Sequence, residues 1–324
     1  MRNRPFARLG LSMLVVGTFA LAGCGGGDEG GDEGAGTDDA AASSLDGASL
    51  AVGSKDFAEQ IILGQMAIQM LEQAGASVDD NTNIVGSANT RAALESGDID
   101  LYWEYTGTGW ITYLGETEPI ADPQEQFEAV RDADLEQNGI VWLDPAPLNN
   151  TYAFAIRREK AEELGVETLS DVAALVESNP AEATFCIESE FSTRDDGWPG
   201  LQEAYGMQVP EDNVALLDTG LIYTETDKGE TCNFGEVFAT DGRISALDLV
   251  VMTDDLSFFP VYQAAVTLKQ ETLEEYPEIA DIMNPVAAEL TDEVMQSLNA
   301  QVDVDGEDPA DVAQAWLQEN GFLQ

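Results

Sequence analysis

The chain has 324 residues, a formal net charge of −49 and no histidine. A surface this acidic repels nucleic acid and anionic lipid, so we expect no nucleic-acid partner. The absence of histidine excludes Ser-His-Asp and Cys-His catalysis, and it also excludes histidine-ligated zinc or copper.

The N-terminal segment has the pattern of a secretion signal. Three arginines precede a short apolar run, residues 9–20, which is too short to span a bilayer. Leu21-Ala22-Gly23 lies directly before Cys24 and resembles the lipobox of bacterial lipoproteins, whose cysteine becomes the lipidated first residue of the mature protein. The alternative is an ordinary signal peptide with an incidental cysteine. We expect residues 1–23 to be a lipoprotein signal peptide and Cys24 to anchor the protein at the outer face of the cytoplasmic membrane.

Residues 24–47 consist mainly of Gly, Ala, Ser, Asp and Glu with hardly an apolar side chain, so they cannot form a packed core. A flexible chain of this composition reaches roughly 25–30 Å. We therefore predict a flexible, acidic, Gly-rich tether between the membrane anchor and a folded extracytoplasmic body.

The remaining residues are too many for one compact core and favour two lobes. Two prolines, Pro145 and Pro147, precede an extended apolar run, which is typical of a hinge that leads into a strand. We place the first lobe in residues 48–149 and 263–324 and the second lobe in residues 150–262.

Alternating strand and helix patterns run through both predicted lobes. A first strand at residues 50–53 leads into a helix that ends at Ala74, and Asp56 with Glu59 gives this helix a start similar to a capping box. Further strands are expected at 83–86, 140–143, 152–156, 183–187, near 214 and at 247–252, and further helices at 90–95, 123–137, 291–299 and 310–319 and from 158 and 170. This alternation predicts an α/β protein with parallel-dominated sheets flanked by helices.

Residues 96–110 combine aromatic, acidic, glycine and threonine residues in one stretch. Ile99 and Leu101 alternate with polar positions, as in a strand that is buried on one face. The following Tyr105-Thr106-Gly107-Thr108 offers an aromatic face and two hydroxyls where the strand turns into a helix, which is where open α/β sheets bind ligands. The alternative is a buried strand end whose aromatic side chains only fill space.

Two cysteines, Cys186 and Cys232, follow Cys24 in the chain. In an oxidising exterior an isolated pair favours a disulfide, and the alternative is two buried thiols. A disulfide between them would contribute about 3–4 kcal/mol in the chain-entropy model and would stabilise one lobe.

The sequence contains no convincing motif for catalysis or cofactor binding. Asp100 and Glu104 have the side chains of a glycosidase pair but lack supporting flanking features. An acidic cluster around Gly306 departs from the spacing of a calcium loop. Nucleophile-elbow, P-loop and dinucleotide-binding motifs are also missing from the sequence. We therefore predict no enzymatic activity, no catalytic residue, no cofactor and no metal site.

A small-molecule binding site is easier to build from these residues. Four aromatic residues lie at strand-to-loop transitions: Tyr105, Tyr152, Phe238 and Tyr262. A quaternary ammonium group cannot donate a hydrogen bond, so proteins hold it with aromatic faces by cation–π attraction and apolar contact. Three further side chains can hold a carboxylate at the other end of the same ligand: Lys55, Thr108 and Arg194.

Several blocks of this sequence, in this order, resemble a known family. The blocks are residues 52–60 (VGSKDFAEQ), 93–102 with 104–108, 149–152 (NNTY), 192–197 (STRDDG), 240–244 (TDGRI) and 258–262 (FFPVY). The chain resembles the extracytoplasmic substrate-binding proteins of glycine betaine/choline/proline-type osmoprotectant ABC transporters over most of residues 48–324.

The resemblance implies a two-lobed fold of the type II periplasmic-binding-protein kind, with the ligand cleft between the lobes. It implies an aromatic box of Tyr105, Tyr152, Tyr262 and Phe238, where Phe238 replaces the usual tyrosine, and a carboxylate site of Lys55, Thr108 and Arg194. The expected partners are a quaternary amine, an ABC permease and its ATPase, and the expected state is a monomer.

Three hypotheses about the function remain open. Lys55 and Arg194 favour glycine betaine or carnitine over choline, which lacks a carboxylate. The same fold can instead bind choline, carnitine or another small solute. A structural or adhesive surface lipoprotein is the alternative of a different class.

Overall fold

The computed structural model describes residues 44–116, 120 and 122–323. The predicted signal peptide, the lipidation of Cys24 and most of the predicted tether lie outside the described residues. Within the described part of the chain, no helix is both long and apolar enough to cross a membrane.

The first sheet has the strand order β2-β1-β3-β10-β4. Its strands are β1 (Ser49–Lys55), β2 (Ser77–Ile84), β3 (Leu101–Tyr105), β4 (Ile140–Trp142) and β10 (Ala264–Lys269). β1 is parallel to β2 and β3, whereas β10 is antiparallel to β3 and β4. The central strand β3 therefore carries Tyr105 to the edge where the predicted ligand site begins.

The second sheet has the strand order β7-β6-β8-β5-β9. Its strands are β5 (Tyr152–Arg157), β6 (Phe185–Ile187), β7 (Val214–Leu216), β8 (Phe234–Phe238) and β9 (Leu249–Val251). β6 is parallel to β7 and β8, whereas β5 is antiparallel to β8 and β9. In register, Tyr152 at the start of β5 lies opposite Phe238 at the end of β8, so two predicted site residues are cross-strand neighbours.

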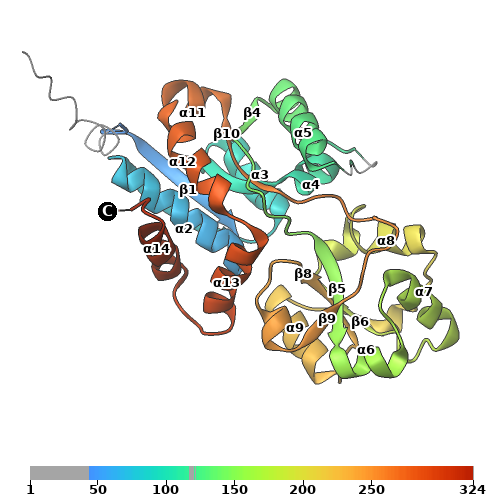
Figure 1. Cartoon of the computed structure of the whole chain (residues 1–324). Helices are drawn as coiled ribbons and strands as arrows, with labels where there is room; N and C mark the ends of the chain where they lie inside the picture. Colours follow the sequence, from blue (N-terminus) through green and yellow to red (C-terminus); the bar gives the residue numbers. More distant parts are fainter. Residues whose placement is uncertain (1–43, 117–119, 121, 324) are drawn as a thin grey trace, which may run out of the picture. The chain divides into compact units, whose positions relative to one another are not determined.

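Both sheets are mixed, which corrects the expectation of parallel-dominated sheets. The chain passes from the first sheet to the second between β4 and β5 and returns between β9 and β10 (Figure 1). The strand that follows each crossing, β5 or β10, is antiparallel to both of its neighbours. The strand direction after a crossing depends on the path between the sheets, and local sequence patterns do not encode that path.

Helices flank both sheets (Figure 1). They are α2 (Ala58–Gln73), α3 (Ser87–Ser96), α4 (Thr106–Thr108), α5 (Pro123–Asn138), α6 (Arg158–Leu164), α7 (Leu169–Ser178), α8 (Trp198–Tyr205), α9 (Thr219–Lys228), α10 (Arg243–Ala246), α11 (Gln270–Glu275), α12 (Glu278–Glu289), α13 (Asp292–Asp303) and α14 (Pro309–Glu319), with a π-helical turn at Gly109–Tyr113 and 3₁₀ turns at Phe191–Thr193 and Glu211–Asn213. The predicted helix at 310–319 is confirmed as α14, which the Asp308 side chain caps and which has Pro309 in its first turn.

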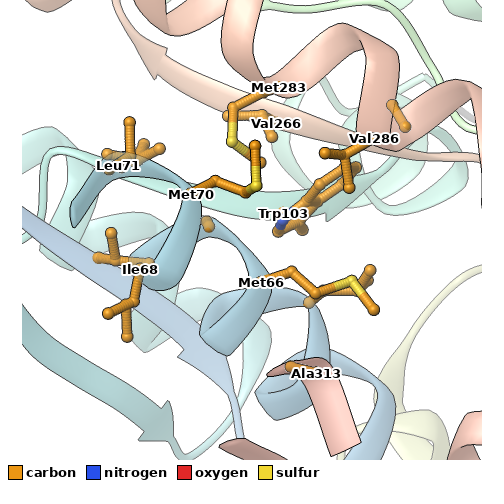
Figure 2. Close-up of a cluster of buried hydrophobic side chains, with 14 of the residues drawn as sticks. Met66, Ile68, Met70, Leu71, Trp103, Val266, Met283, Val286 and Ala313 are labelled. Carbon is orange, nitrogen blue, oxygen red and sulfur yellow. The ribbon is translucent and has the colours of Figure 1, made fainter. Parts of the chain in front are cut away.

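The core beside the first sheet is built around α2, which the C-terminal helices α12, α13 and α14 contact. In Figure 2, Met70, Met283 and Val266 lie close together, and Met66 and Trp103 lie in the same cluster. Methionine fills irregular gaps between helix and sheet, and each fully buried apolar side chain contributes about 1.5–3 kcal/mol. This packing fixes the N-terminal turn of α2, which reaches the candidate site.

The core beside the second sheet is rich in aromatic rings. Phe185 lies between Phe234 and Trp198, with ring centroids 5.3 and 4.8 Å away. The sulfurs of Cys186 and Cys232 are bonded in the structure, which links β6 to the segment that leads into β8. β8 ends at Phe238, so this disulfide stabilises the strand that carries one wall of the site.

Three local predictions need correction. The second strand is Ser77–Ile84 rather than 83–86, because β2 is a polar edge strand held by backbone pairing with β1. β3 is buried on both faces, because Leu101 and Trp103 pack in the core around α2 while Tyr102 packs in a second cluster with residues of α5. No capping box opens α2: its N-cap residue is Phe57, Asp56 accepts from the Gly86 N–H at 3.3 Å, and Glu59 points to buried donors described below.

Candidate functional site

A cavity of about 470 Å³ lies among residues carried by both sheets. Its volume is within the range of small-molecule sites. Six of the predicted site residues line it: Lys55, Tyr105, Thr108, Tyr152, Phe238 and Tyr262. The strand ends that looked separate in the sequence therefore meet at one cavity.

Aromatic side chains form a continuous wall of this cavity. The ring centroids of Tyr152 lie 5.3 Å from both Phe238 and Tyr262, and the Tyr152 and Tyr262 rings meet edge to face. Phe57 continues the row, 5.1 Å from Phe238 and 6.2 Å from Tyr105. We call Phe57, Tyr105, Phe238, Tyr152 and Tyr262 the aromatic wall. Rings that pack on one another at these distances are already held in place, so little conformational entropy is lost when a ligand binds against them.

Phe57 is a wall residue that the sequence analysis missed. It is the N-cap residue of α2, it lines the cavity, and its ring stacks on Phe238 at an interplanar angle of 20°. The available signal was its position between Lys55 and Glu59 in a block that resembled the family. An apolar residue before a helix usually packs on its first turn, so its local context favoured a structural role.

The turn after β3 needs a glycine at position 107, because the Tyr262 ring lies very close to it. A Cβ added at Gly107 would lie 2.5 Å from the Tyr262 ring, which is closer than real Cβ contacts. α4 starts at Thr106 directly after Tyr105, and this close approach brings Thr108 to the cavity beside Tyr262. The turn therefore joins a wall residue from β3 to one that precedes β10.

Lys55 lines the cavity but already has an ionic partner. Its Nζ lies 2.6 Å from Glu104 Oε1 and 5.2 Å from the centroid of the Tyr105 ring. Glu104 also accepts hydrogen bonds from the hydroxyls of Tyr102 and Tyr113 and from the Tyr105 N–H. This buried network, rather than a glycosidase pair, is the role that the structure gives Glu104, and it holds Lys55 at the base of the wall.

Arg194 is placed at the edge of the site and is not among the residues that line the cavity. Its guanidinium donates to both carboxylate oxygens of Asp196, at 2.7 and 2.5 Å, and to Glu190 at 2.8 Å. It lies 5.5 Å from the centroid of the Tyr152 ring, and its Nη2 is 3.5 Å from Thr108 Oγ1. The Tyr262 hydroxyl donates to the same Asp196 at 2.6 Å. Direct binding of a ligand carboxylate by Arg194 would require one of these acids to give way.

Acidic side chains line the cavity in excess of basic ones. Asp56, Glu188, Glu190 and Glu236 line it, and Lys55 is the one basic residue among the described lining residues. Burial, supported by the neighbouring Glu188 carboxylate, raises the pKa of Glu236 to about 8. In the sequence Asp56 stands out only as part of a helix start, and Glu188, Glu190 and Glu236 do not stand out, because each looks like a surface residue in so acidic a chain.

Glu190 connects the two sides of the site. Its carboxylate accepts from the Ser87 N–H at the start of α3 at 2.9 Å and from Arg194 at 2.8 Å. Burial alone would raise the pKa of Glu190, but Lys55, Arg194 and the Ser87 hydrogen bond lower it. An ionised carboxylate is also favoured at the N-terminus of a helix. Glu190 therefore holds the segment after β6 against α3.

Taken together, the cavity offers aromatic faces to a cation and several carboxylates nearby, while its basic groups are already paired. This arrangement can bind a quaternary ammonium group by cation–π attraction and by the surrounding negative charge.

Comparisons with known proteins give the family. Residues 48–319 match the family model described as the substrate binding domain of ABC-type glycine betaine transport systems. The chain is 38% identical over 279 residues to the glycine-betaine-binding protein of Pseudomonas aeruginosa. This match covers 85% of this chain and 88% of the relative. It is 32% identical over 280 residues to the glycine betaine-binding protein YehZ of Escherichia coli, covering 84% of this chain and 91% of the relative.

Solved structures agree with this assignment. The unliganded structure of YehZ from Escherichia coli has a TM-score of 0.63 at 31% identity and covers 85% of this chain and 99% of that one. A structure described as a glycine betaine/carnitine/choline ABC transporter has a TM-score of 0.68 at 27% identity, again with 85% and 99% coverage. The two mixed sheets with flanking helices are thus the type II periplasmic-binding-protein fold, and the family consists of transport proteins rather than enzymes. The chain belongs to the family of substrate-binding domains of ABC-type glycine betaine transport systems.

Proposed function

We propose that this protein captures glycine betaine in the cavity beside the aromatic wall and delivers it to an ABC permease and its ATPase. The observation that supports this proposal most strongly is the wall itself, because five aromatic rings border one cavity. Trimethylammonium groups are held by such faces at about 2 kcal/mol or more when they are desolvated. The Pseudomonas relative carries the name of a glycine-betaine-binding protein.

The carboxylate of glycine betaine would lie toward Lys55 and Thr108. Lys55 Nζ lies beside the Tyr105 ring and lines the cavity, and Thr108 offers a hydroxyl on the same wall. Arg194 would contribute through Thr108 and through its position over Tyr152, unless ligand binding displaces one of its acidic partners. A charge-assisted bond of this kind is about twice as strong as a neutral one.

A second candidate is choline or another cation without a carboxylate. The specific observation in its favour is that Lys55 and Arg194 are both paired with acids, while Asp56, Glu188 and Glu190 border the cavity. Glu236, whose pKa is raised to about 8, can ionise beside a bound cation. A cation without its own negative charge would gain from this surrounding charge and would lose nothing at the paired cations.

Ligand binding would stabilise a closed arrangement of two lobes, residues 48–149 with 263–324 and residues 150–262. The cavity is lined from both segments, so a bound ligand contacts both and favours the arrangement in which they are close. Residues 143–151 and 252–263 connect the two sheets and are the expected hinges. The mature protein would be held by a lipid on Cys24 and would act as a monomer at the outer face of the cytoplasmic membrane.

Calorimetric titration of the purified protein with glycine betaine, choline, carnitine and proline tests the proposal. Micromolar binding corresponds to about −8 kcal/mol, which one caged cation and one paired carboxylate can supply. Heat with glycine betaine and not with choline supports both halves of the site. Heat with choline alone supports the second candidate, a cation without a carboxylate. No heat with any of the four ligands contradicts the proposal that the protein binds this class of small solutes.

The proposed lipid anchor at Cys24 can be tested separately. Mass spectrometry of the mature N-terminus should find a lipid-modified Cys24, and Cys24→Ser should release the protein from membranes. An unmodified Cys24 on a released protein would support an ordinary signal peptide instead.

A further inference from the structure

Glu59 is a buried carboxylate that lies behind the aromatic wall. It is in the first turn of α2 and its residue is 2% exposed. It does not line the ligand cavity but borders a small hollow of about 10 Å³, together with Phe57, Asn150 and Phe238. Because these three residues also line the ligand cavity, they separate Glu59 from it.

Four hydrogen-bond donors converge on this carboxylate. Oε1 accepts from the Tyr105 hydroxyl at 2.7 Å and from Asn150 Nδ2 at 2.8 Å. Oε2 accepts from Thr240 Oγ1 at 2.5 Å and from Asn299 Nδ2 at 2.9 Å. Across residues 44–116, 120 and 122–323, no basic side chain forms an ion pair with Glu59. A buried carboxylate without donors is strongly unfavourable, so these bonds fix its position and it fixes theirs.

Burial raises the pKa of Glu59, and the hydrogen bonds from Thr240, Tyr105, Asn299 and Asn150 oppose that rise. A group that carries this cost in the interior needs a compensating role. Packing alone would be served at least as well by an apolar residue of similar volume.

The donors come from distant parts of the chain. Tyr105 ends β3 in the first sheet, whereas Thr240 follows β8 in the second sheet. Asn150 lies in the first chain crossing, and Asn299 lies in α13. Thr240 is held further, because its N–H donates to Asn150 Oδ1 at 3.3 Å and its carbonyl accepts from Asn299 at 3.0 Å. Glu59 thus joins the end of β3 to the end of β8, and both ends carry wall residues.

Two carboxylates hold Tyr105, one at its backbone N–H and one at its hydroxyl. Its backbone N–H donates to Glu104 Oε1 at 2.7 Å, and its hydroxyl donates to Glu59. Loss of the hydroxyl bond would free the ring to turn away from Phe57 and the rest of the wall. A cation–π contact depends on the position of the ring face, so such a turn would weaken ligand binding.

We propose that Glu59 is a positioning residue for ligand binding, which acts through the Tyr105 hydroxyl to orient the wall and through Thr240 to keep Tyr105 and Phe238 at a fixed separation. This inference rests on the proposed function of the cavity. It assigns a role in affinity to a side chain that the ligand does not touch.

A double-mutant cycle tests it. Glu59→Gln, Tyr105→Phe and the double variant are titrated with whichever of glycine betaine and choline binds the wild type, and each is also unfolded with urea. Glu59→Gln should weaken binding about tenfold, or about 1.4 kcal/mol. In the Tyr105→Phe background the same change should weaken binding clearly less than tenfold, because the bond to the Tyr105 hydroxyl is already absent and only the route through Thr240 remains. If the two losses multiply in the double variant, Glu59 does not act through Tyr105 and the inference is overturned.

Asp134→Asn is the matched control. Asp134 is another fully buried carboxylate, it holds Arg91 and Trp142 by hydrogen bonds, and it does not line the ligand cavity. It should lower the urea midpoint as Glu59→Gln does while ligand affinity at low temperature stays at the wild-type value. An equal loss of affinity in Asp134→Asn would show general destabilisation and overturn the inference.

The failure of this inference and the failure of the proposed function give different results. A wild-type protein that binds neither ligand contradicts the proposed function, and the inference falls with it even if urea unfolding shows the Glu59–Tyr105 coupling. A wild-type protein that binds glycine betaine or choline while the binding cycle is additive contradicts the Glu59 inference alone.

Discussion

The aromatic wall and the two basic residues Lys55 and Arg194 surround the same cavity but differ in what they leave available to a ligand. The wall rings pack on one another and still line the cavity. The basic groups are neutralised within the protein, Lys55 by Glu104 and Arg194 by Asp196 and Glu190. The wall rings therefore keep surface that faces the cavity, although Lys55 lies over Tyr105 and Arg194 over Tyr152. The basic residues offer a ligand only what their acidic partners release.

This difference assigns separate effects to the two sets. Aromatic faces act on any quaternary ammonium group, so they should control affinity for all such ligands alike. Paired basic residues act only on a ligand that has its own negative charge, so they should control the choice between glycine betaine and choline. Four variants test this division, and they follow from the largest expected effect to the smallest.

Tyr152→Ala should weaken binding the most. Its ring is the centre of the wall, in contact with Phe238 and Tyr262, and Arg194 lies over it. Loss of about 2–3 kcal/mol of cation–π attraction and aromatic burial predicts a loss of roughly 30- to 150-fold in affinity. Titration calorimetry should show this loss for glycine betaine and choline equally. Tyr152→Phe is the control and should keep most of the affinity, while a loss confined to one ligand would contradict the division between wall and basic residues.

Arg194→Ala should separate the two ligands. Glycine betaine should lose about tenfold in affinity, because the carboxylate loses a nearby positive charge. Choline should lose less than about twofold, since the change leaves the surroundings more negative. Equal losses for both ligands would show that Arg194 only supports Tyr152 and Asp196.

Arg243→Ala is a matched control for Arg194→Ala. Arg243 also pairs with a nearby aspartate, Asp241, and its guanidinium lies 4.0 Å from the centroid of the Tyr223 ring. It does not line the ligand cavity. Removing it should lower stability without changing the ratio of the two affinities. A changed ratio would mean that the ratio reports general damage rather than the site.

The sequence predicted the fold well wherever helix and strand signals were local. The first strand, the long helix after it and the capped C-terminal helix lie where expected. The strand β2 was misplaced because its residues are mostly polar, and its position depends on pairing with β1. The strand directions were misjudged because β5 and β10 follow crossings between the sheets, which no local pattern records.

The site was predictable where residue type and strand end coincided. Tyr105, Tyr152, Phe238 and Tyr262 line one cavity, as their positions at strand ends suggested. The ion pairs of the basic residues were not predictable. Asp196 stands two residues after Arg194, yet the sequence does not show that both of its carboxylate oxygens accept hydrogen bonds from the Arg194 guanidinium. Phe57 and Glu59 were missed for a related reason. Both belong to the start of a helix, where capping explains them locally, and only the fold brings them against β3 and β8.

Phe57→Leu should have a smaller effect than Tyr152→Ala. Leucine keeps the apolar volume at the start of α2 but removes the π face between Tyr105 and Phe238. Loss of a partly exposed cation–π contact of about 0.5–1 kcal/mol predicts a two- to fivefold weaker affinity for both ligands. Calorimetry with the thermal midpoint as a control checks it. An unchanged affinity would mean that Phe57 only packs against Phe238 and contributes nothing to the ligand.

Glu236→Gln should change ligand affinity the least at neutral pH, and its effect should be seen in how affinity depends on pH. The carboxyl of Glu236 lines the cavity, and burial with the added influence of Glu188 raises its pKa to about 8. A bound cation stabilises the ionised form, so the pKa of Glu236 falls when the ligand enters. Between the lower pKa of the complex and the pKa of the free protein, binding releases a proton, and affinity therefore rises with pH until it levels off above about 8.

Choline affinity measured from about pH 6 to about pH 9 should rise several-fold in the wild type and stay flat in Glu236→Gln. Glycine betaine should show a weaker rise, because its own carboxylate offsets the cation at Glu236. The Glu188 N–H donates to Glu236 at 2.7 Å, and glutamine keeps an oxygen that can accept this bond, so the variant should fold normally. A rise that persists in Glu236→Gln would assign the titration to Glu188, whose pKa burial also raises. The negative charge that favours a cation would then come from the segment after β6 rather than from β8.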